Sequence, residues 1–300
     1  MKINLISHDN GVGLSQDMAL LENFLSARGH KIRRSEWKEK SRSADVNIYL
    51  ELFHRRHLKT ADKHVGIFNM EWFLAKWEDH LAEFTQLWAK SGEAHRWFCD
   101  RRLPSTLTGF LSRDLFADGA RHRGCLHVRG KSSQKGTWIV LSAWRKYGTK
   151  LPPLTVVAHN LSDLDLVPGV EFVQGPITDD RIRSLMNRCR FHICPSETEG
   201  WGHYIAEALS CGGVVVTTDA SPMNEHVSAD HGTLLVPRNT RKEHCITRSF
   251  VDSDELADAV MRLAQLSETQ LGVMSDSARR SYLRRQGHFC KVADNLLREL

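Results

Sequence analysis

The chain has 300 residues, of which 41% are hydrophobic, and a formal net charge of +5 at pH 7 with its histidines neutral. This composition is that of a globular protein, and the length suits two domains that each bury a core. No apolar run approaches the roughly 18 residues of a membrane-spanning helix, and residues 1–11 predict a strand and a turn instead of a signal peptide, so we expect a cytoplasmic protein.

Basic residues gather at 54–59, 101–102, 121–123 and 279–285. A solvated surface explains these clusters, and the alternative is an affinity for nucleotide phosphates, an anionic membrane or nucleic acid. The excess charge is small for a protein that binds nucleic acid, which favours the solvated surface. The 7 cysteines lack C-x-x-C or His/Cys zinc spacing, so we interpret them as reduced core residues and predict no metal ligands.

Residues 1–112 alternate between strand and helix patterns, as a Rossmann-like sheet requires. Apolar and β-branched runs predict strands at 2–7, 31–34, 45–50, 64–69, 95–99 and 105–110. Helical spacing predicts a helix near 15–28 and a helical stretch that ends near residue 90, with Trp77 and Trp88 in the core. Gly11 and Gly13 follow the first strand and predict either a tight turn or a loop that approaches a phosphate.

The chain from residue 113 onward repeats this alternation. Its pattern predicts strands at 125–129, 154–159, 170–173, 190–194, 214–218 and 232–236, and helices near 137–147, 177–189, 203–211, 252–266, 267–281 and 286–300. Lys131 and Lys135 lie in the loop between the first of these strands and the first helix. Two lysines there can bind a diphosphate and stabilise the charge on a departing phosphate, and the alternative is an exposed loop.

Residues 190–220 predict a strand, a loop, a helix and a second strand. The loop follows the carboxyl end of a parallel strand, which is where open α/β sheets bind ligands. Gly200 and Gly202 allow close backbone approach, and the first helical turn offers amides to an anion. Glu199 and Glu207 can accept hydrogen bonds from sugar or ribose hydroxyls, although solvated glutamates are the simpler interpretation of the pair alone.

This stretch closely resembles the signature of the retaining family-four glycosyltransferases of GT-B fold (glycosyl transferases group 1). The positions that match are Pro195, Ser196, Glu199, Gly200, Trp201, Gly202, Glu207, Ala208, Gly212, Val215, Val216 and Asp219. The resemblance implies an α/β GT-B architecture, in which two Rossmann-like domains with parallel sheets face a central cleft. Residues 1–112 would then form an acceptor-binding domain and residues 113–285 the nucleotide-sugar domain, with the helix 286–300 packing back towards the first.

The resemblance also assigns roles to residues. Glu199, Lys135 and Lys131 would be catalytic, with Lys131 in place of the family's arginine and one residue closer than its pattern expects. Asn69 to Trp72 follow a strand end and are candidates for the acceptor wall. The donor would be bound by Glu207 on the ribose, by the loop residues Gly200, Trp201, Gly202 and His203, by Gly11 and Gly13 on the diphosphate, and by Ile177 beside the base.

The reaction implied is transfer of a hexose from a UDP- or GDP-sugar to a glycan, lipid or other hydroxyl acceptor with retention of configuration. The lysines and helix amides would replace a metal, so we predict no cofactor and no metal, and we interpret Asp163 and Asp165 as an accidental D-x-D. Peripheral contact with a membrane is compatible with this interpretation. Two alternatives stay open: a phage-type glycosyltransferase acting on a hydroxylated DNA base, and a non-catalytic nucleotide-binding protein of the same fold.

Overall fold

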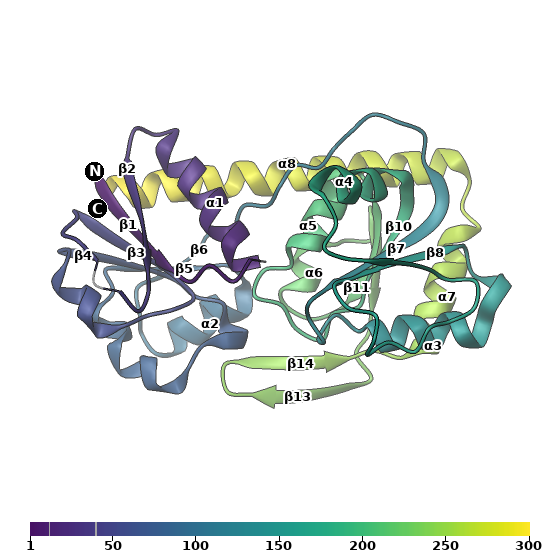
Figure 1. Cartoon of the computed structure of the whole chain (residues 1–300), viewed down its shortest axis with the longest axis horizontal. Coiled ribbons are helices and arrows are strands. Elements are labelled where there is room, and N and C mark those ends of the chain that lie inside the picture. The colour runs from purple at the N-terminus through teal and green to yellow at the C-terminus, as the bar shows by residue number, and fades with distance from the viewer. Residues whose placement is uncertain (12, 40) are drawn as a thin grey trace. The chain divides into compact units, whose positions relative to one another are not determined.

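The computed structural model describes residues 1–11, 13–39 and 41–300, which divide into two compact units. Unit 1 contains Met1–Ser112, Glu243–Ile246 and Arg285–Leu300, and unit 2 contains Arg113–Lys242 and Thr247–Arg284. Each unit is built on a six-stranded sheet whose neighbouring strands all pair in parallel (Figure 1). The predicted α/β class with two Rossmann-like parallel sheets is therefore confirmed.

The sheet of unit 1 has the order β2-β1-β3-β4-β5-β6. Its strands are β1 (Lys2–Ser7), β2 (Lys31–Glu36), β3 (Val46–Leu50), β4 (Lys63–Ile67), β5 (Gln86–Ala89) and β6 (Ser105–Leu107). The helices of this unit are α1 (Gly13–Ser26), α2 (Gly92–Asp100) and the 3₁₀ helices η1 (Arg55–Lys59), η2 (Met70–Trp72) and η3 (Ala75–Glu83). Every residue of β3 is buried, as expected of a central strand covered on both faces.

Two predictions in unit 1 were wrong. The strand predicted at 95–99 is part of α2, where the Oγ of Ser91 accepts a hydrogen bond from the amide of Ala94 at 3.2 Å and caps the helix. The helical stretch predicted to reach residue 90 divides into η3 and strand β5. Trp77 and Trp88 are both buried, which confirms the predicted core, but they belong to these two different elements.

The sheet of unit 2 has the order β12-β11-β10-β7-β8-β9. Its strands are β7 (His122–Gly130), β8 (Leu154–Ala158), β9 (Glu171–Gln174), β10 (Cys189–Cys194), β11 (Val214–Thr218) and β12 (Gly232–Leu235). The helices are α3 (Thr137–Tyr147), η4 (Gly148–Lys150), α4 (Asp179–Arg188), α5 (His203–Ser210), α6 (Met223–His226) and α7 (Ser253–Ala264). Val214 and Val216 lie in one core cluster and Val215 in another, so both faces of the sheet are buried.

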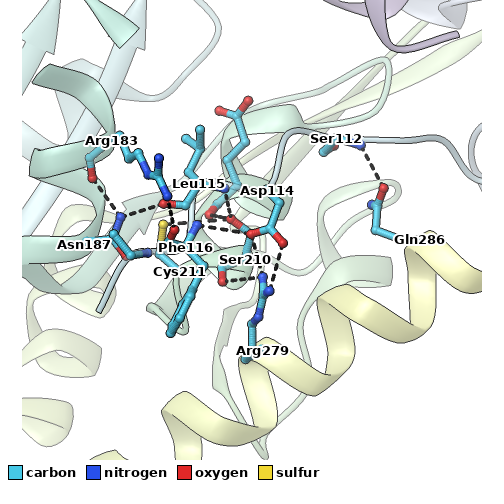
Figure 2. Close-up of polar contacts among 12 residues, drawn as sticks. Ser112, Asp114, Leu115, Phe116, Arg183, Asn187, Ser210, Cys211, Arg279 and Gln286 are labelled. Atoms are coloured by element: carbon cyan, nitrogen blue, oxygen red, sulfur yellow. Dashed lines mark hydrogen bonds and ion pairs between the residues drawn. The ribbon is translucent and has the colours of Figure 1, made fainter. Parts of the chain in front are cut away.

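The first residues of unit 2 are fixed by hydrogen bonds to α4, α5 and the last helix (Figure 2). Leu115 donates its amide to the Oγ of Ser210 at 3.0 Å and accepts from the Nδ2 of Asn187 at 2.7 Å. Arg279 forms two hydrogen bonds with the carboxylate of Asp114, at 2.6 and 2.8 Å. The segment that leaves unit 1 is thus an ordered part of unit 2 from its start.

Two further elements differ from the predictions. Strands β13 (Asn239–Glu243) and β14 (Ile246–Phe250) form a two-stranded sheet that the sequence did not predict. The last two predicted helices are one continuous helix, α8 (Glu268–Arg298), because no proline interrupts the segment between them. No helix among residues 1–11, 13–39 and 41–300 is both long and apolar enough to cross a bilayer.

Two fully buried histidines make the stability of unit 2 depend on pH. His127 on β7 donates from Nδ1 to the carbonyl of Ile193 at 2.7 Å, while its Nε2 lies 2.8 Å from the hydroxyl of Thr137. Burial, aided by the charge of Lys135, lowers the pKa of His127 to about 4. Burial, with the charge of Arg121, lowers the pKa of His192 to about 4 as well. Both side chains are therefore neutral in the folded protein.

We expect the free energy of unfolding to fall as the pH drops from 6.5, the ordinary histidine value, to about 4. In this window the unfolded chain binds protons that folded His127 and His192 refuse, which gives a slope of up to about 1.4 kcal/mol per pH unit for each histidine. Denaturant titrations across this range measure the slope. His127→Gln should remove the contribution of one histidine to this slope, whereas His159→Gln, at an exposed position, should leave the slope unchanged. Equal slopes in all three proteins would contradict the assignment.

Candidate functional site

The candidate site of unit 2 lies where the strand-to-helix loops leave the carboxyl edge of its sheet. The loop between β7 and α3 carries Lys131 and Lys135, and the loop between β10 and α5 carries Glu199. Because β7 and β10 are hydrogen-bonded neighbours, the two loops emerge side by side. Residues that are 64 positions apart in the sequence therefore meet at one edge.

Lys135 and Glu199 form an ion pair at the centre of this edge, and their side chains are only 17% and 10% exposed. The Nζ of Lys135 donates to Oε1 of Glu199 and lies 4.0 Å from the centre of the Tyr204 ring. The hydroxyl of Ser196 donates to the same carboxylate oxygen and contacts the Tyr204 hydroxyl at 2.5 Å. The lysine charge is thus held in one place by a carboxylate and an aromatic face.

A glycine makes this arrangement possible. Gly136 has a left-handed backbone with φ of +68°, and a Cβ added to it would lie 2.1 Å from the carbonyl oxygen of Pro195. The amide of Glu197 donates to the carbonyl of Gln134 at 2.9 Å, which joins the same two loops. A residue with a side chain at position 136 would therefore push the loops apart and displace Lys135.

Glu207 lies on α5 and is nearly buried, at 6% exposure. Its Oε1 accepts a hydrogen bond from Nε of Arg113 at 2.8 Å, and the Nη1 of the same arginine donates to Asp179 at 2.8 Å. The sequence analysis missed Arg113, because nothing in its local pattern links it to a glutamate 94 positions later. The guanidinium fixes the orientation of the Glu207 carboxylate beside the start of α4.

The loop residues before α5 have two different surroundings. Gly202 adopts a left-handed backbone with φ of +91° directly before the helix, whose first residue is His203. Gly200 is partly exposed on the same loop, whereas the Trp201 side chain is buried with its ring centre 4.3 Å from that of His226. The indole therefore packs inside unit 2, and a ligand at this loop would meet backbone and glycine rather than the tryptophan ring.

A second carboxylate of the loop was also missed by the sequence analysis. Glu197 is buried, at 4% exposure, and its carboxylate accepts a hydrogen bond from Arg248 on β14. Its carbonyl accepts from the amide of Ser249 at 2.8 Å. Glu197 thus connects the loop between β10 and α5 to β14. The local sequence does not distinguish the buried Glu197 from Glu199, two residues later.

The sequence analysis of unit 2 also named Lys131, Ile177 and the D-x-D pair. Lys131 is exposed, and it follows Gly130, which has a left-handed φ of +60°. Ile177 is partly buried against the core between β9 and α4, at the same edge of the sheet. Asp163 and Asp165, the D-x-D pair, form ion pairs with Arg129 and Arg145 respectively.

Unit 1 has a polar cluster of its own at the carboxyl ends of β3, β4 and β5. Lys90 is 1% exposed and donates to Asp17 at 2.5 Å and to Asn69 at 2.8 Å. Asn69 in turn donates to Glu51 at 2.6 Å, and burial raises the pKa of that carboxyl. Of these four, the sequence analysis named only Asn69.

The other predicted residues of unit 1 lie near strand ends. Trp72, three residues after Asn69, is 56% exposed. Gly11 has φ of +66° and donates its amide to the Oδ1 of Asp9 at 3.1 Å and to the Oγ of Ser15 at 2.7 Å, so it forms a tight turn before α1. Gly13 is the first residue of α1 and is exposed.

Comparison with known proteins relates part of the chain to one family. Residues 160–270 match the family described as glycosyl transferases group 1. A protein described as an uncharacterized glycosyltransferase of Methanocaldococcus jannaschii is 31% identical over 84 residues, which make up 28% of this chain but only 22% of that protein. These matches confirm the resemblance that the glutamate-rich loop and its helix predicted.

Solved structures show the same fold over almost the whole chain. Anabaena HepE in complex with UDP and glucose has a TM-score of 0.71 at 15% identity and covers 100% of both chains. A sucrose-phosphate synthase of Thermosynechococcus elongatus has a TM-score of 0.75 at 12% identity, over 99% of this chain and 98% of the other. A glycosyltransferase of Rickettsia africae has a TM-score of 0.76 at 11% identity, with the same coverage. The predicted GT-B architecture is confirmed by this likeness.

Gly136→Ala tests whether the close contact between the two loops stabilises unit 2. We expect it to lower the free energy of unfolding by about 1–3 kcal/mol, because both the left-handed backbone and the clash with Pro195 oppose a side chain. Calorimetry or denaturant unfolding measures the loss. Gly130→Ala is the matched control, because Gly130 has a similar φ of +60° but open space around its Cβ position. If both variants lose the same stability, the contact with Pro195 has no structural role.

Proposed function

We propose that this chain is a retaining glycosyltransferase that moves a hexose from a nucleotide diphosphate sugar to a hydroxyl group of an acceptor. The observation that carries the proposal is the partly buried Lys135–Glu199 pair at the carboxyl edge of the sheet, with Lys135 in the loop before α3 and Glu199 in the loop before α5. The family match over residues 160–270 includes Glu199, Glu207 and the whole of α5. The UDP-bound HepE structure supports a UDP-sugar as donor, and a GDP-sugar is the second choice.

In this proposal the diphosphate binds over the two loops of unit 2. Lys135, aided by Lys131, neutralises the charge that develops on the leaving diphosphate, which is the main electrostatic contribution to the rate. The amides at the start of α5 add partial positive charge, and Gly200 and Gly202 leave their backbone open to close approach. Positive charge from lysines and amides would replace a metal ion here, so the reaction needs no cofactor.

The carboxylates orient the rest of the donor. Glu199 accepts hydrogen bonds from the sugar hydroxyls, and Lys135 and Ser196 hold its carboxylate in place for that purpose. Glu207, oriented by Arg113, accepts from the ribose hydroxyls. Ile177 offers an apolar contact to the base at the end of β9.

Unit 1 provides the acceptor site in this scheme. Its cluster of Glu51, Asn69 and Lys90 combines donors and acceptors suited to hydroxyl groups, and the exposed Trp72 offers a face for a sugar ring. A glycan or a lipid-linked sugar fits these groups better than duplex DNA does, because Lys90 is buried and already bonds to the carboxylate of Asp17 and to Asn69. The free, mostly buried cysteines support a reducing, cytoplasmic setting.

A donor screen tests the proposal. UDP-, GDP-, ADP- and TDP-sugars are compared by thermal shift and by slow donor hydrolysis, with a chelator present throughout. We expect one donor to stabilise the protein by about 2.7 kcal/mol at 100 times its Kd. Lys135→Ala and Glu207→Ala should abolish this shift, because they remove the diphosphate and ribose contacts.

The control is Lys150→Ala, which removes an exposed lysine from η4 in the same unit. Stabilisation without any turnover, even with a broad acceptor set, would favour a non-catalytic nucleotide-binding protein. Transfer only to hydroxylated DNA, lost at high salt, would favour the DNA-modifying alternative. No stabilisation by any donor would contradict the proposal.

A further inference from the structure

The hairpin of β13 and β14 has an unusual turn. Two residues, His244 and Cys245, connect the strands. Two-residue hairpin turns require a positive φ, and glycine or asparagine normally occupies that position. Here His244 has φ of +37°, a conformation that residues with side chains rarely adopt. The backbone of the turn alone does not explain a histidine at this position.

These contacts all lie within unit 1, to which the hairpin tip Glu243–Ile246 belongs. The Nε2 of His244 is 3.1 Å from Oε1 of Glu78 on η3. Cys245 is buried, at 4% exposure, in the aromatic core cluster of this unit. The imidazole nitrogen, the thiol sulfur and a carboxylate oxygen of Glu78 all lie within 4.8 Å of one another.

The chemistry of these three groups selects a class of ion. A nitrogen and a sulfur ligand disfavour magnesium and calcium, which prefer oxygen, and suit zinc, which binds Cys, His and carboxylate together. Tetrahedral zinc with bonds of about 2.0–2.3 Å places its ligand atoms about 3.3–3.7 Å apart. Because the three ligand atoms already lie within 4.8 Å of one another, an ion would need only a small closure of the side chains. His244 has a side chain that is 42% exposed, which gives an ion a route from solvent.

We propose that Glu78, His244 and Cys245 form a zinc site, with a fourth position open to water. The ion would join the turn of the hairpin to η3, two segments that are far apart in the sequence. Cys245 would bind as a thiolate, and its proton would leave to solvent. Arg101, whose Nε is 3.2 Å from the other oxygen of Glu78, would fix that carboxylate from the far side. The site belongs to unit 1 and does not rest on the proposed function.

In such a site Cys245 would be a metal ligand and not only a core residue, as the sequence analysis interpreted it. The simpler alternative is that His244 and Glu78 form an ion pair and that Cys245 only fills space in the core. The two interpretations differ in the role of the Cys245 sulfur, which binds the ion only if the metal site exists. A test must therefore detect a metal–sulfur bond.

The experiment uses the full chain after removal of metals with a chelator, and Co²⁺ as the probe. We expect one equivalent of Co²⁺ to bind with a thiolate-to-cobalt charge-transfer band, and Zn²⁺ to displace it. Cys245→Ser should abolish the band and weaken Zn²⁺ binding by more than about 100-fold, because even groups behind the ligands change affinity about 10- to 100-fold. His244→Asn should weaken binding similarly, and asparagine tolerates the left-handed turn, so the hairpin keeps its backbone.

Cys99→Ser is the matched control. Cys99 is exposed on α2 with its sulfur 3.7 Å from the His95 ring nitrogens, which makes it a competing place for a thiophilic ion in this unit. This variant should keep the band and the affinity. Absence of a band in the unaltered protein, its persistence in Cys245→Ser, or its loss in Cys99→Ser would overturn the proposal. If Cys245→Ser fails to fold, undiminished Zn²⁺ affinity in His244→Asn would overturn it equally.

Discussion

The candidate site depends on the close contact between two strand-to-helix loops of unit 2. Gly136 approaches the Pro195 carbonyl more closely than any side chain would allow, and the Gln134–Glu197 backbone hydrogen bond holds the loops together. Lys135 lies between these two restrained positions, and its side chain is directed at Glu199. A lysine in an untethered loop would extend into solvent, where its charge is screened and its conformations are many. The contact converts a mobile charge into a fixed one.

A fixed charge is what phosphate chemistry requires. Groups that are aimed at developing charge before the reaction starts need no reorganisation during it, and this is the main way in which a protein stabilises a leaving diphosphate. Lys135 is restrained by Glu199 and by the Tyr204 ring, while Arg113 restrains Glu207. Each of these side chains, which we propose to bind the donor, thus has a partner that orients it, which is how precise sites are usually supported.

The sequence predicted the central β-loop-α-β unit well because its signals are local. The run Val214–Thr218 is β-branched throughout, and glycines mark both ends of α5. Elsewhere local spacing misled: Trp77, Leu81, Phe84 and Trp88 follow a helical period, yet the last of them lies on the short strand β5. The hairpin lacks the Asn-Gly turn that would have revealed it. Arg113 and the Lys90 cluster were missed because their partners are distant in sequence and only the fold brings them together.

Both parallel sheets place polar side chains at the carboxyl ends of their strands, but the side chains differ between the two units. In both, charged or polar residues follow directly after buried strands, because the carboxyl edge is where a parallel sheet opens to ligands. The edge of unit 2 combines lysine, glycine backbone and a helix start, which together suit an anion. At the edge of unit 1, Lys90 donates to Asp17 and Asn69, and Asn69 donates to Glu51, so the lysine charge is already paired within the cluster. This difference supports our proposal that the phosphates bind to unit 2 and a hydroxyl-bearing acceptor to unit 1.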